Sequence, residues 1–196
     1  MKKLCCVLLC GVLLFMTGCS LSDKKQAETE NTAALIDSGK YYKVYDGTIS
    51  EAYEIYNADG ELVRSDSTDK PLTVSMLTDY TVDISEGVGT GITRHTYYNA
   101  EKDIFSEDFF YVICAQEDMI AYIGASQEDT EHSKTLIVQS IFDKDNYYKE
   151  FENAFANLST FDLSTVSGDF SNDFSELTIY YVSEETQEPV SEAFRL

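Results

Sequence analysis

Residues 92–125, ITRHTYYNAEKDIFSEDFFYVICAQEDMIAYIGA, decide the fold class. Three apolar or aromatic runs, ITRHTYY, FFYVICA and MIAYIG, are separated by short polar segments rich in Asn, Asp and Glu. β-branched and aromatic side chains favour strands, and polar segments at this spacing favour turns between them. The stretch therefore predicts consecutive antiparallel strands.

The same alternation of apolar or aromatic runs with polar segments continues on both sides of this stretch. The chain holds 14 Tyr and 11 Phe but only two Pro, and polar turn signals recur every eight to twelve residues from Tyr41 onward. We predict an all-β fold, mainly an antiparallel meander, in which residues 41–196 form one β domain. The further predicted strands are YYKVY, EAYEIY, LTVSML, YTVDIS, TLIVQSIF, ELTIYYV and VSEAFRL.

A single helix candidate covers residues 145–158, DNYYKEFENAFANL. Tyr147, Phe151, Phe155 and Leu158 recur there at helical spacing, and Asp145 is suited to cap the first turn. The sequence therefore predicts at most one short helix.

A weak internal repeat organises the strands. IYNADGEL around Tyr56, YYNAEKDIF around Tyr98 and SIFDKDNYY around Phe142 share an aromatic residue, an Asn or Asp and a polar turn, at spacings of 42 and 44 residues. A period of this length with about four short strands is typical of propeller blades. Fewer than four such units fit after Tyr41, so we expect a truncated propeller-like stack or, alternatively, a β-sandwich.

The first 18 residues have the layout of a secretory signal. Lys2 and Lys3 precede an uncharged apolar run over residues 4–18. As a helix, this run is roughly 22 Å long, which is less than the ~30 Å hydrocarbon core of a bilayer. The segment is therefore predicted to be a signal peptide and not a permanent membrane span.

The end of this run, Met16, Thr17, Gly18 and Cys19, resembles the lipobox of bacterial lipoproteins. The resemblance implies cleavage before Cys19 and acylation of its sulfur, which places the protein on the extracytoplasmic face of the cell membrane. Two or three acyl chains hold a protein firmly, whereas one is marginal. The alternative is an uncleaved signal anchor.

Residues 19–40 are interpreted as the lipidated cysteine and a flexible tether. Residues 20–39 are polar and contain no aromatic side chain. Twenty flexible residues have a root-mean-square reach of about 25 Å, which is enough to lift a domain off a bilayer.

Charge and cysteine content narrow the function classes. Removal of Lys2 and Lys3 leaves 12 basic and 35 acidic side chains, a net charge of −23. Affinity for nucleic acid needs clustered Lys and Arg, so no nucleic-acid partner is expected. After cleavage Cys114 is the one free thiol, and it lies in the apolar run FFYVICA, where a cysteine most often behaves as a small buried side chain.

No catalytic, metal or cofactor site is predicted. His95 and His132 lack Cys or His partners at zinc-ligand spacing, and His95 is expected to be a strand side chain with an ordinary hydrogen-bond partner. The turns DKDN at Asp143 and NADGE at Asn57 fit either hairpin chemistry or a calcium site, and hairpins are favoured. The glycine-rich EGVGTGI segment, 86–92, leads into a strand and is interpreted as a hairpin connection.

Three Tyr-Tyr doublets are candidates for a carbohydrate or peptide contact surface. Alternation along a strand directs one ring of each doublet inward and the other outward. The doublets are Tyr97 and Tyr98, Tyr147 and Tyr148, and Tyr180 and Tyr181.

The mature part resembles small lipoproteins of Gram-positive bacteria, on the segments YYNAEKDIFSEDFF, IFDKDNYYKEF and ELTIYYVSEETQEPVSEAFRL. The resemblance implies a family with no assigned activity, so no functional residues carry over. We expect a non-enzymatic binding or interaction module of the cell envelope, whose partner is an envelope or extracellular protein or a glycan. The alternatives are a small carboxylate-dependent hydrolase acting on wall glycan or peptide, and an accessory subunit of an envelope complex.

Overall fold

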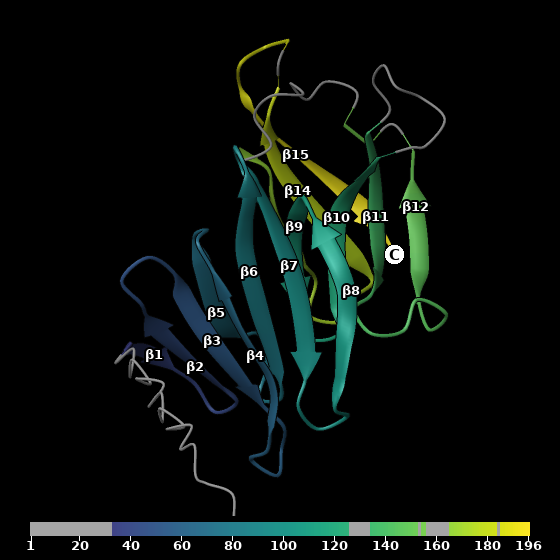
Figure 1. The fold of residues 1–196 in the computed structure, drawn as a ribbon. Coiled ribbons are helices and arrows are strands. Elements are labelled where there is room, and N and C mark those ends of the chain that lie inside the picture. The colour runs from purple at the N-terminus through teal and green to yellow at the C-terminus, as the bar shows by residue number, and fades with distance from the viewer. Residues whose placement is uncertain (1–32, 126–133, 153, 156–164, 184) are drawn as a thin grey trace, which may run out of the picture. The chain divides into compact units, whose positions relative to one another are not determined.

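The computed structural model describes residues 33–125, 134–152, 154–155, 165–183 and 185–196. This part of the chain is all-β, as predicted, with 15 strands arranged in four antiparallel sheets (Figure 1). Within each sheet the strands follow one another in chain order, so every sheet is a meander.

The first sheet begins earlier than the sequence suggested. Its strands are β1 (Ala34–Ser38), β2 (Tyr42–Asp46), β3 (Glu51–Tyr56) and β4 (Leu62–Thr68). Strand β1 lies inside the segment 19–40 that was predicted to be tether, so the predicted boundary at Tyr41 was too late. The reason is that β1 pairs with β2 through its main chain while all five of its residues are exposed, which leaves no burial pattern in the sequence.

The second and third sheets contain four strands each. The second consists of β5 (Leu72–Met76), β6 (Thr81–Gly89), β7 (Ile92–Asn99) and β8 (Ile104–Phe110). The third consists of β9 (Val112–Gln116), β10 (Met119–Ala125), β11 (Lys134–Ser140) and β12 (Tyr148–Phe151). The fourth sheet has three described strands, β13 (Ser167–Phe170), β14 (Glu176–Val182) and β15 (Pro189–Arg195).

The helix candidate over 145–158 is not borne out where the structure describes it. Residues 148–151 form strand β12, in which Tyr148 is paired with Gln139 and Phe151 with Leu136 of β11. Pairing along the free edge of β11 satisfies the main-chain groups of this segment, and tertiary context of this kind overrides a helical pattern. Residues 153 and 156–158 of the candidate lie outside the described part.

Each unit of the sequence repeat corresponds to one four-stranded sheet. Tyr56 ends β3, Tyr98 lies near the end of β7, and Phe142 follows β11, and each of these strands is the third in its sheet. A spacing of 42 to 44 residues therefore measures one four-stranded meander, which agrees with the predicted propeller-like repeat.

Successive sheets pack through shared apolar clusters. The first and second sheets meet through Tyr53 and Ile55 on one side and Val82 and Tyr98 on the other. Face-to-face burial of this kind is also how the sheets of a β-sandwich are held together. The second and third sheets share a cluster of Tyr97, Phe109, Ile120 and Ile141. The third and fourth share Ala121, Ile123, Leu136, Val138, Phe170, Leu177, Ile179 and Tyr181.

No core cluster of the described residues joins the first sheet to the fourth. The arrangement is a stack of meanders, in which the second and third sheets are each covered on both faces. Pockets between neighbouring sheets are therefore the places where side chains from distant segments meet.

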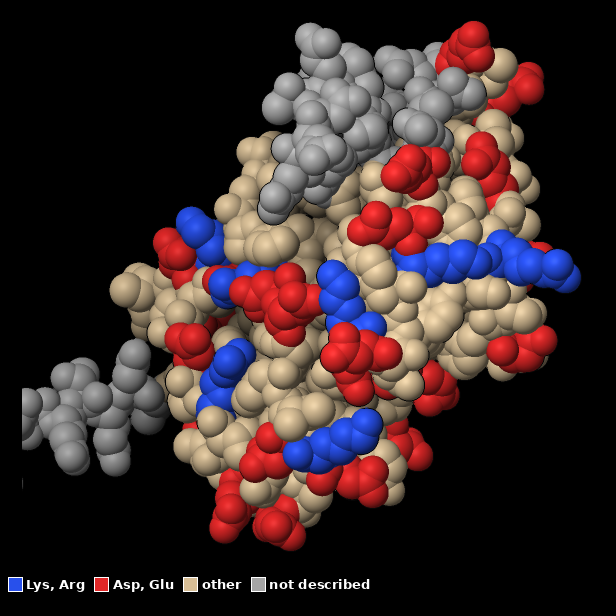
Figure 2. All heavy atoms as spheres, turned by 90° about the vertical axis from the view of Figure 1, so that its right-hand side faces the viewer, with Lys and Arg blue, Asp and Glu red and all other residues tan. Residues whose placement is uncertain are grey.

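The surface carries mixed charges with an acidic excess. The whole chain has a formal net charge of −21, and on the face in Figure 2 the Lys and Arg side chains lie among Asp and Glu side chains. In the described part of the chain, no helix is long and apolar enough to cross a bilayer.

Candidate functional site: pockets between the sheets

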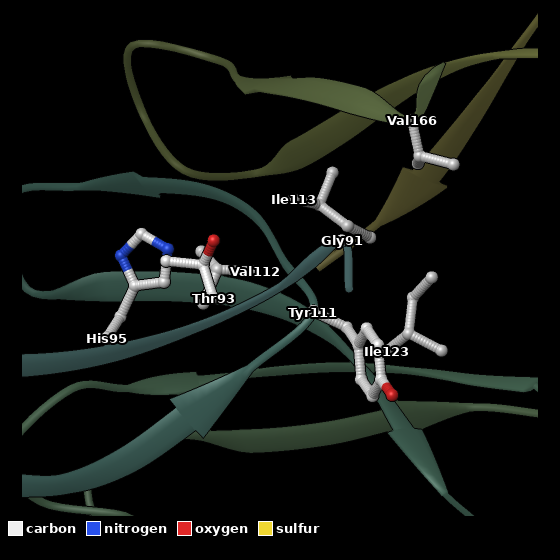
Figure 3. A pocket seen from close by; sticks show the side chains of 8 residues that line it. All are labelled: Gly91, Thr93, His95, Tyr111, Val112, Ile113, Ile123 and Val166. Carbon is white, nitrogen blue, oxygen red and sulfur yellow. The ribbon is translucent and has the colours of Figure 1, made fainter. Parts of the chain in front are cut away.

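One pocket of about 240 Å³ opens beside the contact between the second and third sheets (Figure 3). Polar groups come from β7, and apolar walls come from β9, β10 and the residue before β13. The lining residues are Gly91, Thr93, His95, Tyr111, Val112, Ile113, Ile123 and Val166. We call it the His95 pocket.

A strained tyrosine shapes this pocket. Tyr111 is the single residue between β8 and β9, and its φ is 54°. Its carbonyl accepts a hydrogen bond from the main-chain N–H of Ile123 at 3.1 Å, which ties the crossing between the sheets to β10. A positive φ in a bulky residue costs about 1–3 kcal/mol and persists only where the surroundings impose it. Here it brings the exposed Tyr111 side chain to the pocket wall.

His95 is fixed from one side. Both oxygens of the Asp83 carboxylate lie 3.1 Å from its Nδ1, and the Ser85 hydroxyl lies 3.0 Å from the same nitrogen. Asp83 and Ser85 are two residues apart on β6, and Ser85 is the cross-strand partner of His95, so all three share one face of the sheet. The His95 ring also stacks on Tyr97, with centroids 6.2 Å apart.

This geometry determines what His95 can do. A carboxylate accepts hydrogen bonds, so Nδ1 carries the proton and the neutral ring has an acceptor at Nε2. No hydrogen bond within the described ranges uses Nε2. The arrangement is not a Ser-His-Asp triad, because Ser85 and Asp83 both approach Nδ1, whereas a triad uses the two ring nitrogens separately. His95 thus has the ordinary strand partner that was expected, and it is also a fixed hydrogen-bonding group for a ligand.

A second pocket of about 230 Å³ lies between the first and second sheets. It is mostly polar and is lined by Tyr53, Arg64, Asp66, Ile84, Glu86, Arg94, Thr96 and Asp108. We call it the Arg64 pocket. Sequence analysis assigned no role to its charged residues, because they come from four strands and their proximity depends on the stacking of the two sheets.

The charged side chains that the second sheet contributes to this pocket are paired with one another. Arg94 hydrogen-bonds to Glu86 and lies 3.7 Å from the Asp108 carboxylate. The Thr96 hydroxyl donates to Asp108 at 2.6 Å, and the Thr68 hydroxyl donates to Glu86 at 2.5 Å. Two carboxylates against one guanidinium leave this wall with a net charge of −1.

Cys114 is a half-buried side chain. It packs at the edge of the cluster between the third and fourth sheets, and burial together with the Asp169 carboxylate raises the pKa of its thiol to about 12. A thiol with so high a pKa holds almost no thiolate near neutral pH, which makes it a poor nucleophile.

In the two turns considered as calcium sites, side-chain oxygens accept hydrogen bonds from main-chain N–H groups of the same turn. Asn57 Oδ1 accepts from the main-chain N–H groups of Asp59 and Glu61, and Asp143 Oδ1 accepts from Asp145. No group of three or more metal-ligating side chains occurs in the described ranges. The glycine-rich segment contains the predicted hairpin connection, but β6 extends to Gly89 and β7 begins at Ile92, so only Thr90 and Gly91 lie between the strands. Gly91 adopts a φ of +71° there. Cys19 and His132 lie outside the described residues.

Comparison of the sequence with protein-family models finds no match, and comparison with curated proteins finds none either.

Proposed function

We propose that this protein is a membrane-anchored lipoprotein whose β domain binds an envelope or extracellular ligand without transforming it. The anchor is supported by the lipobox-like sequence that ends at Cys19. The binding role is supported by the His95 pocket, where a histidine fixed at Nδ1 by Asp83 lines a cavity with apolar walls.

Such a pocket suits a ligand with one hydrogen-bond donor beside an apolar group. Ligand sites are typically concave and largely apolar, with a few fixed polar groups that set the orientation. Val112, Ile113 and Val166 supply apolar walls, and His95 and Thr93 supply the polar groups. The Asp83 carboxylate holds the imidazole before any ligand arrives, which lowers the entropic cost of binding.

The anchor is tested in the cell membrane. Full-length protein should sediment with membranes and partition into detergent, whereas Cys19→Ser should appear in the soluble fraction or stay uncleaved. Mass spectrometry of the mature N-terminus should find acyl chains on Cys19. An unmodified Cys19 in sedimenting protein would contradict the lipid anchor and favour an uncleaved signal anchor.

The pocket is tested with the full chain in detergent micelles and purified peptidoglycan, its peptide fragments and its disaccharide fragments as ligands. We expect one of these to bind, with a loss of about tenfold in affinity for His95→Ala and a smaller loss for Asp83→Asn. Asp69→Asn, at a surface position beside Lys70, is the matched control for a lost carboxylate. Equal binding by all variants would exclude this pocket as the site.

A second candidate is a hydrolase, which one observation favours. A histidine oriented by a carboxylate is a common general base. Turnover of labelled wall fragments by wild type, abolished in His95→Ala, would establish this activity. Binding without turnover would retain the first proposal.

A further inference from the structure

The Arg64 pocket contains one cation and one anion that lack ionic partners. Within the described part of the chain, no carboxylate lies within 4.0 Å of the Arg64 guanidinium, and no cation lies within that distance of Asp66. Both side chains line the same cavity, in contrast to Arg94, which is already paired with two acids. We infer that this pocket binds a zwitterion, with a free α-amino acid as its smallest ligand.

The two charges lie on one face of a single strand. Arg64 and Asp66 are two residues apart on β4 and therefore point to the same face of the first sheet. The guanidinium carbon of Arg64 lies 3.9 Å from the centroid of the Phe105 ring, which holds the cation in place across the gap between the sheets. A ligand whose carboxylate pairs with Arg64 and whose ammonium pairs with Asp66 would bridge the two side chains.

Tyr53 lines the same pocket as this charge pair. It is buried, and it is the cross-strand partner of Asp66. Burial raises the pKa of its hydroxyl, and the Arg64 guanidinium partly offsets that rise, so the hydroxyl stays protonated near neutral pH. A protonated hydroxyl can donate to the ligand carboxylate that Arg64 attracts.

The opposite wall selects against a simple anion. Glu86, Arg94 and Asp108 together carry a net charge of −1, and the whole chain is strongly acidic. A ligand with a carboxylate alone would meet this repulsion without compensation, and a neutral sugar would leave Arg64 and Asp66 unpaired. A zwitterion satisfies both charges. The cavity of about 230 Å³ is large enough for a small amino acid.

The test is calorimetric titration of the full chain in detergent micelles with glycine, alanine, glutamate and lysine. Each amino acid is compared with two derivatives: its amide, which keeps the ammonium, and its N-acetyl form, which keeps the carboxylate. We expect at least one free amino acid to bind and both of its derivatives to bind about tenfold more weakly or worse, since each loses one charge-assisted contact.

Two variants make the expectation residue-specific. With Arg64→Gln the free amino acid and its amide should bind alike, because the carboxylate has lost its partner. With Asp66→Asn the free amino acid and its N-acetyl form should bind alike. Lys70→Gln and Asp69→Asn are the matched charge controls on the surface and should bind as wild type does. Urea unfolding of each variant verifies that it is folded.

Three results would contradict the binding of a zwitterion in this pocket. Absence of binding by every amino acid, equal binding of the derivatives to wild type, or binding that the Arg64 and Asp66 variants leave unchanged would each overturn the inference. His95→Ala should not alter amino-acid binding. The outcome is thus independent of whether the His95 pocket has its proposed role.

Discussion

Tyr97 and Tyr98 are neighbours on β7 and are buried in two different cores, with 1% and 0% of their surface exposed. Tyr97 packs with Phe109 between the second and third sheets, and Tyr98 packs with Val82 between the first and second. Alternation along the strand sends the rings to opposite faces, and both faces are covered. This doublet therefore holds three sheets together.

The other two doublets follow the predicted pattern. Tyr181 is buried while Tyr180 is exposed, and Tyr147 packs at a core edge while Tyr148 is exposed. In both doublets one ring faces a core and the other is exposed to solvent.

Truncation of Tyr98 should therefore be costly. Tyr98→Ala is expected to lower the free energy of unfolding by about 3–5 kcal/mol, as for other buried aromatic residues, because it opens a cavity between two sheets. Tyr180→Ala, at a position that is 43% exposed, should cost less than about 1 kcal/mol. Urea unfolding followed by circular dichroism measures both, and similar losses would contradict the two-core arrangement.

Cys114 should be protected from alkylation in the folded protein. At pH 8 its thiol, with a pKa of about 12, should react with iodoacetamide far more slowly than in urea. Peptide mass spectrometry reads this site separately from other cysteines. Because the folded pKa is raised, the thiol contributes stability at low pH that is lost as pH rises from about 9 to about 12. This loss should be smaller in Cys114→Ala. Rapid native alkylation would show that the site opens.

Asp173 should titrate at unusually low pH. Hydrogen bonds from the Ser175 and Ser171 hydroxyls and the Ser175 main-chain N–H lower its pKa to about 2. A lowered carboxylate pKa stabilises the fold above the unfolded value near 4, and this contribution is lost as pH falls toward 2. NMR titration of the side chain measures the pKa directly. In Asp173→Asn this part of the acid dependence should disappear. An ordinary pKa would indicate that the turn is not formed.

Gly168 should resist substitution. A Cβ on this residue of β13 would lie 3.0 Å from Cγ2 of Ile113 on β9 and 3.1 Å from the carbonyl oxygen of Thr178 on the paired strand β14. Gly168→Ala is thus expected to cost about 1–3 kcal/mol through overpacking.

Gly89 provides the control for this prediction. A Cβ there would meet its nearest neighbour, Cδ1 of Ile92, at 3.8 Å, which is ordinary contact. Gly89→Ala should therefore be neutral or slightly stabilising. Thermal unfolding of the two variants measures both effects. A neutral Gly168→Ala would show that the third and fourth sheets can separate locally.

Much of the fold could be predicted because local patterns carry it. Runs such as YTVDIS and ITRHTYY alternate with turns, and the spacing between Tyr56, Tyr98 and Phe142 reports one four-stranded meander. Two elements were misjudged where pairing on a sheet edge outweighed the local signal. Strand β1 has no buried side, and β12 has apolar residues at helical spacing yet pairs with β11.

The candidate sites were less predictable for a different reason. One face of the β6–β7 hairpin carries Asp83, Ser85 and His95. Strand alternation in YTVDIS and TRHTYY could therefore have predicted that these side chains lie close together. Arg64 and Arg94 lie on different sheets, and no local pattern relates them.

The sequence by itself determined the β class, the four-stranded repeat, the acidic charge and the lipobox-like segment at Cys19, because each depends on composition or on spacing within a short stretch. The tertiary structure alone decided which faces are buried and which side chains line the pockets. Those properties arise when one sheet covers another, and the stacking of sheets brings together residues from strands that are distant in the chain.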